Sequence, residues 1–282
     1  MSDATEPHAD EPRAAARAPR VALFVTCLVD LFRPNVGFAC IKLLEDAGCS
    51  VTVPPLQTCC GQPAYNNGDF KNAGRLARQV VKAFEGYDYV VAPSGSCIGM
   101  LKEHFPRLFA TDVRWRARAQ ALAARCHEIV SFLHDVLGVR ELSARHRATT
   151  TYHDSCSGLR ELGIHTQPRT LLASVEGLEL RELEDGNVCC GFGGTFCVKY
   201  PRISERLVAD KVANVTASGS DELLGGDLGC LLNIAGRLKR EGSGVKVYHV
   251  AEILADMGDV PAIGDPAGGG ADDPSMRSST PE

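Results

Sequence analysis

The hydrophobic positions of this chain alternate between short apolar runs and longer segments with helical spacing. The short runs, mostly rich in β-branched residues, predict strands at 21–26, 51–53, 89–92, 149–152, 178–183, 222–224 and 245–248. Between them, apolar residues spaced three or four apart predict helices over 34–47, 69–85, 113–137, 167–175, 201–217, 231–239 and 250–257, and a further helix is expected to begin near Cys97. Strands that alternate with helices are typical of α/β proteins with parallel sheets.

The same order of elements occurs twice, about 130 residues apart, and each copy contains a Cys-Cys-Gly sequence. A single cysteine at the end of a strand precedes each pair, and another follows it. The first set is Cys27, Cys59, Cys60 and Cys97, and the second is Cys156, Cys189, Cys190 and Cys230. The repeat predicts an α/β fold of two similar lobes with parallel, Rossmann-like sheets.

Composition divides the chain into five segments. Residues 1–20 and 258–282 have no apolar period and are rich in small, charged and Pro or Gly residues, which predicts a disordered arm and a disordered tail. The first lobe is expected over 21–112, a helical connector over 113–148, and the second lobe over 149–257.

Charge and length limit the class of protein. A net charge of -5 and few aromatic residues argue against nucleic acid as a partner. The apolar run from Val21 to Val29 is far shorter than the roughly 20 residues of a membrane span. Asp30 follows it at once and no small-residue cleavage site appears, so the run is interpreted as a strand and the cytoplasm as the location.

The two cysteine sets are candidates for metal binding. In a reducing compartment, cysteines at repeated spacing are more often metal ligands than disulfides. In open parallel sheets, sites lie beyond the carboxyl ends of the strands, so each lobe is expected to gather four thiols at its own edge. Four thiolates can hold a [4Fe-4S] cluster or a tetrahedral zinc ion. The glycine after each pair would let the backbone approach such a centre closely.

Other candidate residues carry weaker signals. Cys40, Cys49 and Cys126 lie outside the repeat and are expected to be buried as small apolar residues. Cys197 is near enough in sequence to reach the second centre, but the first repeat has no counterpart, so it is left out of the ligand set. His153 could serve a metal centre, together with Asp154.

The alternative for His153 and Asp154 is a satisfied polar pair at the end of a strand, and both interpretations stay open. His249 is expected to be structural. Arg160, Arg169 and Lys199 could hold a carboxylate, but solvated charge is the preferred interpretation.

The cysteine motifs are similar to those of twice-repeated CCG-domain proteins. These include the cysteine-rich component of heterodisulfide reductase, the iron–sulfur subunit of glycolate oxidase and, with the greatest similarity, the lactate utilization protein A family. The motifs are Phe24-Val25-Thr26-Cys27, Gln57-Thr58-Cys59-Cys60-Gly61-Gln62-Pro63-Ala64, Pro93-Ser94-Gly95-Ser96-Cys97, Cys189-Cys190-Gly191-Phe192-Gly193-Gly194-Thr195-Phe196 and Cys230-Leu231-Leu232-Asn233-Ile234 with Gly236-Arg237-Leu238. The resemblance covers roughly residues 20–257.

The resemblance implies an iron–sulfur electron-transfer subunit of a complex that oxidises L-lactate to pyruvate. Its partners would be other lactate utilization subunits, one of them a ferredoxin-type iron–sulfur protein, and peripheral membrane association would come through these partners. The fuller family pattern ends each repeat in Cys-x-x-Cys, whereas this chain has Ser94 and Asp227 at the first position. Five-cysteine clusters can therefore not be assumed, although four thiols still suffice for an ordinary [4Fe-4S] cluster. The expected cofactors are one or two [4Fe-4S] clusters, with zinc open for one repeat.

Two other functions remain consistent with the cysteines. Two zinc sites would make the chain a scaffold that recruits the enzyme, and metal-free pairs would make it a thiol redox switch. The sequence Gly191-Phe192-Gly193-Gly194 lacks the spacing of a dinucleotide fingerprint, so a nicotinamide or flavin site is not expected in this chain.

Overall fold

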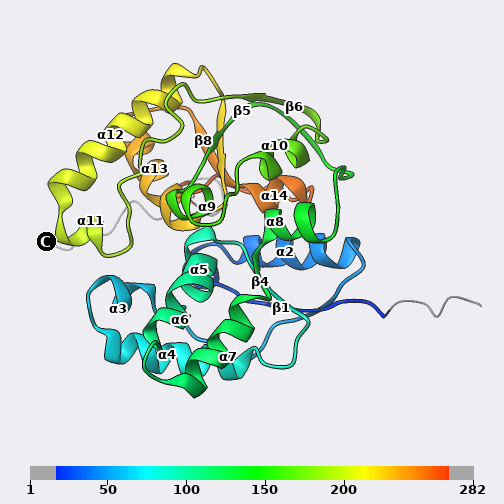
Figure 1. Ribbon diagram of the computed structural model, residues 1–282. Coiled ribbons are helices and arrows are strands. Elements are labelled where there is room, and N and C mark those ends of the chain that lie inside the picture. The colour runs from blue at the N-terminus through cyan, green and yellow to red at the C-terminus, as the bar shows by residue number, and fades with distance from the viewer. Residues whose placement is uncertain (1–16, 267–282) are drawn as a thin grey trace, which may run out of the picture.

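The first half of the chain forms a lobe around a parallel sheet. The structure is a computed structural model that describes residues 17–266 (Figure 1). The strands β1 (Arg20–Leu23), β2 (Ser50–Thr52), β3 (Tyr89–Ala92) and β4 (Cys126–Glu128) pair in the order β2-β1-β3-β4. The helices of this lobe are α1 (Cys27–Phe32), α2 (Pro34–Asp46), α3 (Gln62–Asn66), α4 (Phe70–Ala83), α5 (Gly95–Gly99), α6 (Phe105–Leu108), α7 (Val113–Ala123) and α8 (Ile129–Ser131), with π-helical turns η1 (Met100–His104) and η2 (Phe132–Val136).

The second half repeats this architecture. The strands β5 (Arg145–His153), β6 (Glu176–Arg181), β7 (Glu222–Gly225) and β8 (Lys246–His249) pair in parallel in the order β6-β5-β7-β8. The helices of this lobe are α9 (Cys156–Arg160), α10 (Thr166–Leu172), α11 (Phe196–Lys199), α12 (Pro201–Ala217), α13 (Leu228–Arg240) and α14 (Val250–Leu254). The identical strand order confirms the predicted pair of similar α/β lobes.

Local chemistry explains where the main helices begin. Pro34 opens α2, where its missing N–H would have had no helical partner. Asp69 caps α4 by accepting a hydrogen bond from the backbone N–H of Asn72. In β3, Val90, Val91 and Ala92 are all buried, as expected of a parallel sheet covered on both faces.

The two lobes share a hydrophobic core and contact each other in matched pairs. One core cluster includes Val36 and Leu43 of the first lobe and Leu223 and Ile253 of the second. Helix α2 contacts α14 while its counterpart α10 contacts α8, and α5 contacts α9 while α13 contacts α1. Because each contact occurs twice between equivalent elements, the lobes are related by an approximate two-fold axis.

Polar contacts also hold the lobes together. The Arg33 side chain donates to buried Glu252 at 2.9 Å, and the Asn35 amide donates to the same carboxylate at 2.8 Å. Glu252 lies on α14. This helix packs against α2, which is drawn below α14 in Figure 1.

The structure differs from the sequence prediction at three boundaries. The segment 113–137 was expected to be helical, yet it contains β4, which completes the first sheet. Strand β5 begins at Arg145, inside the expected connector. Part of the expected tail is folded, since Ala262 and Ile263 are buried and the Ile263 N–H donates to the Val247 carbonyl at 2.8 Å.

The remaining parts of the predicted arm and tail, 1–16 and 267–282, lie outside the described residues. Among residues 17–266, every helix is too short or too polar to cross a lipid bilayer.

Candidate metal centre

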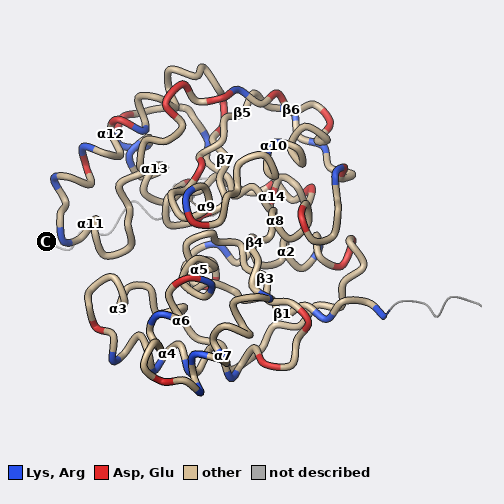
Figure 2. Tube along the Cα trace, in the orientation of Figure 1, with Lys and Arg blue, Asp and Glu red and all other residues tan. Residues whose placement is uncertain are grey.

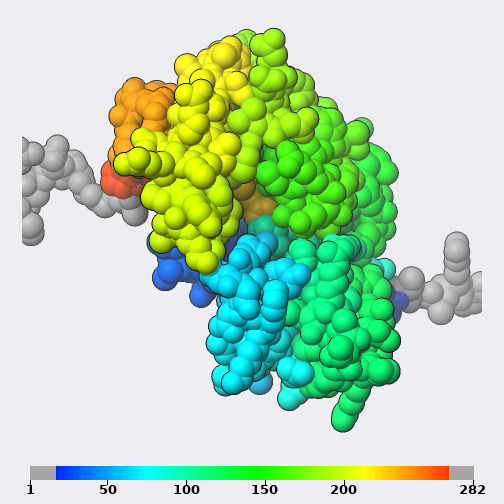
Figure 3. Space-filling model, turned by 60° about the vertical axis from the view of Figure 1, so that its left-hand side comes forward, coloured from blue at the N-terminus to red at the C-terminus, as the bar shows by residue number. Residues whose placement is uncertain are grey.

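A cavity of about 530 Å³ lies between the lobes, and all eight predicted ligand cysteines line it. The sequence predicted a separate set of thiols at the edge of each lobe. In the structure, these two edges face each other across a shared space, because the lobes pack with the carboxyl ends of both sheets toward the cavity. At the surface, the cyan α3–α4 region meets the yellow α11–α12 region across the lobe boundary (Figure 3). Thr195 donates to Asn67 at 3.4 Å there.

Equivalent elements carry the cysteines in both lobes. Cys27 is the first residue of α1 and Cys156 the first of α9. Cys97 is the third residue of α5, and Cys230 the third of α13. The helices that carry Cys97 and Cys230 therefore begin two residues before them. The helix starts at Cys27 and Cys156 were not predicted from the sequence, and they put two more helix N-termini at the cavity.

The Cys-Cys-Gly loops fold tightly around their own sulfurs. The Gly61 N–H donates to Cys59 Sγ at 3.4 Å, and the Gly191 N–H donates to Cys189 Sγ at 3.3 Å. Both glycines have positive φ, 82° and 77°. A Cβ on Gly191 would lie 2.5 Å from the Ser204 carbonyl oxygen, so the loop needs glycine for conformation and for space.

The thiols of each set influence one another strongly. Cys27 Sγ and Cys59 Sγ are 3.8 Å apart, and this hydrogen bond lowers the pKa of Cys59 far below that of an ordinary thiol. The hydrogen bond from Cys156 lowers the pKa of Cys189 in the same way. Hydrogen bonding to Cys59 raises the pKa of Cys60, which is buried. A metal that binds all four thiolates of a set must therefore displace protons, so binding is expected to depend on pH.

The charge of the cavity wall is negative. Apart from the cysteines, its titratable side chains are His104, Glu161 and Asp227, and none of the described lining residues is Lys or Arg. Many of the Lys and Arg residues lie instead on outer helices such as α4, α7 and α12 (Figure 2). A carboxylate such as lactate would find no cationic partner on this wall.

Ser94 and Asp227, each three positions before the last cysteine of its set, meet each other at the lobe interface. Ser94 Oγ donates to Asp227 Oδ1 at 2.8 Å, and the two residues form an isolated antiparallel bridge. Ser96 adds two bonds to the same carboxylate, from Oγ at 2.7 Å and from its backbone N–H at 3.0 Å. These contacts make a polar joint between the lobes.

His153 and Asp154 have separate surroundings, which distinguishes the two open interpretations. Asp154 accepts hydrogen bonds at 3.0 and 2.8 Å from Arg169, which also pairs with Glu182. His153 is 1% exposed, and its ring nitrogens have no hydrogen-bond partner among the described residues. With Cys190 and Cys230 it forms a group whose ligand atoms all lie within 4.8 Å of one another, which could hold a metal ion. Burial lowers the pKa of His153 to about 3, so the imidazole is neutral.

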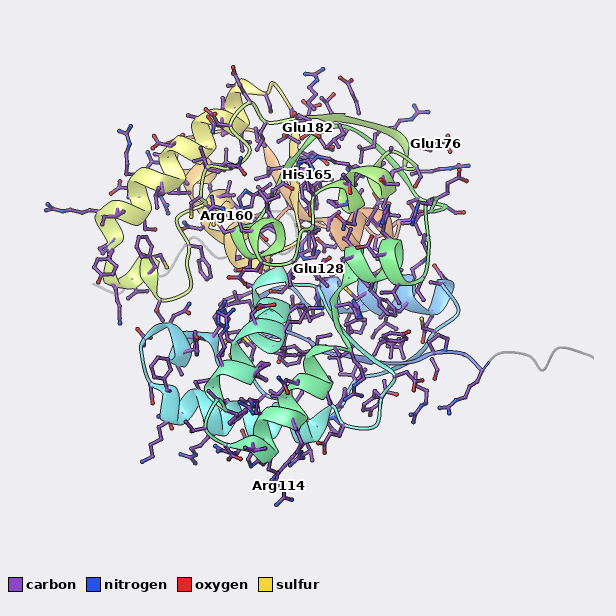
Figure 4. The ribbon with its side chains drawn as sticks, viewed as in Figure 1. Arg114, Glu128, Arg160, His165, Glu176 and Glu182 are labelled. Carbon is purple, nitrogen blue, oxygen red and sulfur yellow. The ribbon has the colours of Figure 1, made fainter. Side chains whose placement is uncertain are left out.

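The other singled-out polar residues lie outside this centre. His249 is buried and contacts the Pro93 carbonyl at 3.2 Å while capping α14, as expected for a structural residue. Arg160, on α9 (Figure 4), donates to the Asn187 carbonyl at 3.3 Å. Arg169 is half-buried in its ion pairs rather than solvated. Lys199 does not line the cavity.

The remaining cysteines also lie away from the cavity lining. Cys40, Cys49 and Cys126 are buried in the core, as predicted. Cys197 Sγ lies 3.2 Å from the Gly194 carbonyl oxygen and is not part of the lining. All twelve cysteines are free thiols.

Comparison with known proteins identifies the family. The family model for cysteine-rich CCG domains matches residues 21–102 and again 150–235. Lactate utilization protein A of Geobacillus sp. (strain WCH70) is 48% identical over 235 residues, which cover 83% of this chain and 98% of the relative. The chain belongs to the lactate utilization protein A family. A second member, from Geobacillus kaustophilus (strain HTA426), is 50% identical with the same coverage.

A solved structure supports the fold alone. The crystal structure of a hypothetical protein from Helicobacter pylori matches with a TM-score of 0.58 at 14% identity, covering 85% of this chain and 49% of that one. The family members therefore support a role in lactate utilization, and the solved structure adds that this architecture occurs in a larger chain.

Proposed function

We propose that this chain is the iron–sulfur electron-transfer subunit of a cytoplasmic complex that oxidises L-lactate to pyruvate. The observation that carries the proposal is the shared cavity, which gathers eight unpaired thiols from both repeats. Among the described residues, its wall has no Lys or Arg to bind a lactate carboxylate, so substrate oxidation is assigned to a partner subunit. Those partners are the other lactate utilization proteins, including one of ferredoxin type, and any membrane association comes through them.

The donor set fits two [4Fe-4S] clusters. Each lobe supplies four thiols, the number that closes such a cluster. Cys27, Cys59, Cys60 and Cys97 would hold the first, and Cys156, Cys189, Cys190 and Cys230 the second. A cavity of about 530 Å³ has the size of a small-molecule site. The clusters would supply single-electron acceptance and donation.

Residues of the chain itself would control the surroundings of these clusters. The Gly61 and Gly191 N–H groups donate to thiolate sulfurs, and hydrogen bonds to sulfur are one of the factors that set a reduction potential. Cys60 and Cys190, 3% and 2% exposed, are shielded from water, whereas Cys27 is exposed. The first set therefore has a solvent-exposed ligand through which a partner could exchange electrons.

Metal content and EPR spectra test the proposal. The chain is purified under strict anaerobiosis and assayed for iron, sulfide and zinc, and its spectrum is recorded before and after reduction. About four to eight irons per chain and a signal that changes on reduction are expected. Cys60→Ala or Cys190→Ala should each lower the iron content toward half, because each removes a ligand from one set. Cys126→Ala, in the core of the first lobe, is the matched control and should keep full iron.

The lactate assignment has its own test. Wild-type chain should restore growth on lactate to a strain that lacks it, whereas the Cys60→Ala and Cys190→Ala variants should not. Normal iron loading combined with growth on lactate in the absence of the chain would contradict the assigned pathway.

Structural zinc is the second candidate, and one distance favours it. With Zn–S bonds of about 2.3 Å, two ligands of a tetrahedral ion lie about 3.8 Å apart, which matches the Cys27–Cys59 separation of 3.8 Å. Zinc without iron in the anaerobic preparation would make the chain a scaffold for the enzyme. Metal-free protein with reversible disulfides would instead indicate a thiol switch.

A further inference from the structure

The two cysteine sets lie on equivalent backbone segments, but the buried side chains of the neighbouring strand ends and helices differ between the two lobes. Phe24 and His153 each stand three positions before the first cysteine of a set; Phe24 directly follows β1, and His153 is the last residue of β5. The glycine of each Cys-Cys-Gly loop contacts the next long helix. Gly61 faces Ala73 and Leu76 of α4, and Gly191 faces Ser204 and Leu207 of α12. This correspondence places Lys211 of α12 at the position of Val80 of α4.

The first set has an apolar backing. Phe24 and Val80 are both fully buried and belong to the same core cluster as Cys60 and Cys97. The Phe24 ring contacts Phe84 edge to face, with ring centroids 5.3 Å apart. In the first lobe, these two positions therefore offer the thiolates neither a cation nor a nitrogen ligand.

The second set has a nitrogen ligand within reach. His153 is 1% exposed, and neither ring nitrogen has a hydrogen-bond partner within residues 17–266; a buried imidazole in that state is costly unless a partner binds it. Its ligand nitrogen and the sulfurs of Cys190 and Cys230 lie within 4.8 Å of one another. Two ligands at 2.0–2.3 Å from one metal ion lie up to about 4.5 Å apart, so the imidazole nitrogen is close enough to these sulfurs to belong to the same metal centre.

The second set also has a buried cation beside it. Lys211 is 0% exposed, and its Nζ donates to the Gly186 carbonyl at 3.0 Å. Four acidic groups interact electrostatically with Lys211: Cys190, Asp154, Cys156 and Cys189. Three of them belong to the cysteine set. A cation close to an anionic centre stabilises the more negative, reduced state of that centre.

We propose that His153 is a nitrogen ligand of the metal centre in the second lobe, in place of one of its four thiolates, and that this centre has a higher reduction potential than the first. The inference rests on the proposed iron–sulfur function. A neutral imidazole brings less negative charge than a thiolate, and histidine ligation raises the potential of iron–sulfur centres. The first centre, backed by Phe24 and Val80, keeps an all-sulfur ligand set.

Pulsed EPR on protein labelled with ¹⁵N-histidine tests the ligand directly in the wild-type chain. A nitrogen coupling of a directly bound imidazole is expected, and only in the signal that appears at the higher potential during a redox titration. His153→Phe, which copies the residue of the first lobe, should abolish that coupling and shift that potential downward while the other stays in place. His104→Gln is the matched control, because His104 also lines the cavity, and it should keep the coupling.

Lys211→Met provides a second variant that leaves His153 in place. It should lower the same potential and keep the nitrogen coupling. Iron-loaded wild-type protein without a histidine coupling, or with two centres of equal potential, would overturn the inference while leaving the proposed function intact. Protein without iron would instead overturn the proposed function itself.

Discussion

Removing the Asp227 carboxylate is expected to weaken the joint between the lobes. Asp227 is 5% exposed and accepts three hydrogen bonds from the other lobe: from the hydroxyls of Ser94 and Ser96 at 2.8 and 2.7 Å, and from the Ser96 N–H at 3.0 Å. Asp227→Ala removes the acceptor of all three. The Ser96 N–H then has no acceptor in its place.

The magnitude follows from these contacts. Hydrogen bonds to a charged group contribute about 1.5–3 kcal/mol each, but the two hydroxyls, already 3.1 Å apart, can bond to each other after the substitution. We therefore expect Asp227→Ala, which removes three such bonds and leaves the Ser96 N–H without an acceptor, to lower the free energy of unfolding by about 3–5 kcal/mol. Asp227→Asn keeps an acceptor for the hydroxyls and should lose about 1–3 kcal/mol.

Urea unfolding of the metal-free, reduced chain measures this effect. With a slope of about 3 kcal/mol per molar urea, Asp227→Ala should lower the midpoint by about 1–2 M. Hydrogen exchange at the Ser96 amide should accelerate in parallel, because its acceptor is Asp227. Both variants lying within about 0.5 kcal/mol of the wild type would refute the argument that this carboxylate joins the lobes.

The remaining predictions concern the same interface. The double variant Ser94→Cys/Asp227→Cys should form a disulfide on mild oxidation of the metal-free chain. The reason is that paired residues of an antiparallel bridge have Cα atoms about 4.5–5.5 Å apart, within disulfide range. Peptide mapping that finds both new cysteines reduced would contradict this prediction. Glu128, between the lobes in Figure 4, has its pKa raised to about 8 by burial, so the stability it provides is complete below pH 4.5 and is lost as pH rises through 8. Glu128→Gln should therefore gain stability relative to wild type between pH 5 and pH 9, and a difference between their urea midpoints that does not change with pH would count against the raised pKa.

The sequence predicted the repeated part of the fold because strand and helix signals were strong there. Runs such as Tyr89–Ala92 are apolar and β-branched and lie in the middle of a sheet. Strand β4 was missed because Cys126-His127-Glu128 is short and polar, and only its pairing with β3 makes it a strand. Ala262 and Ile263 were missed because Gly and Pro dominate their surroundings, while burial against the second lobe fixes them.

The candidate site was predictable one lobe at a time. Spacing and the rule for parallel sheets located each cysteine set at the end of its strands, where the structure has them. The shared cavity could not be predicted, because it depends on how the two lobes pack. The contact between Ser94 and Asp227 could not be predicted for the same reason. In the sequence, each residue was noted only because it stands where the family pattern has a cysteine. His153 did carry a signal, since it stands at the strand end before Cys156.

The approximate two-fold axis has a consequence for the way such a protein can arise. In a symmetric dimer of two identical single-repeat chains, a residue on the axis faces its own copy. Two aspartates there would repel each other, and two serines would bring no charge to the contact. Fusion of the repeats into one chain frees the halves from being identical, so the axis can hold a serine on one side and an aspartate on the other. The covalent link thus lets equivalent positions of the two halves carry different residues, which a symmetric dimer of identical chains cannot do.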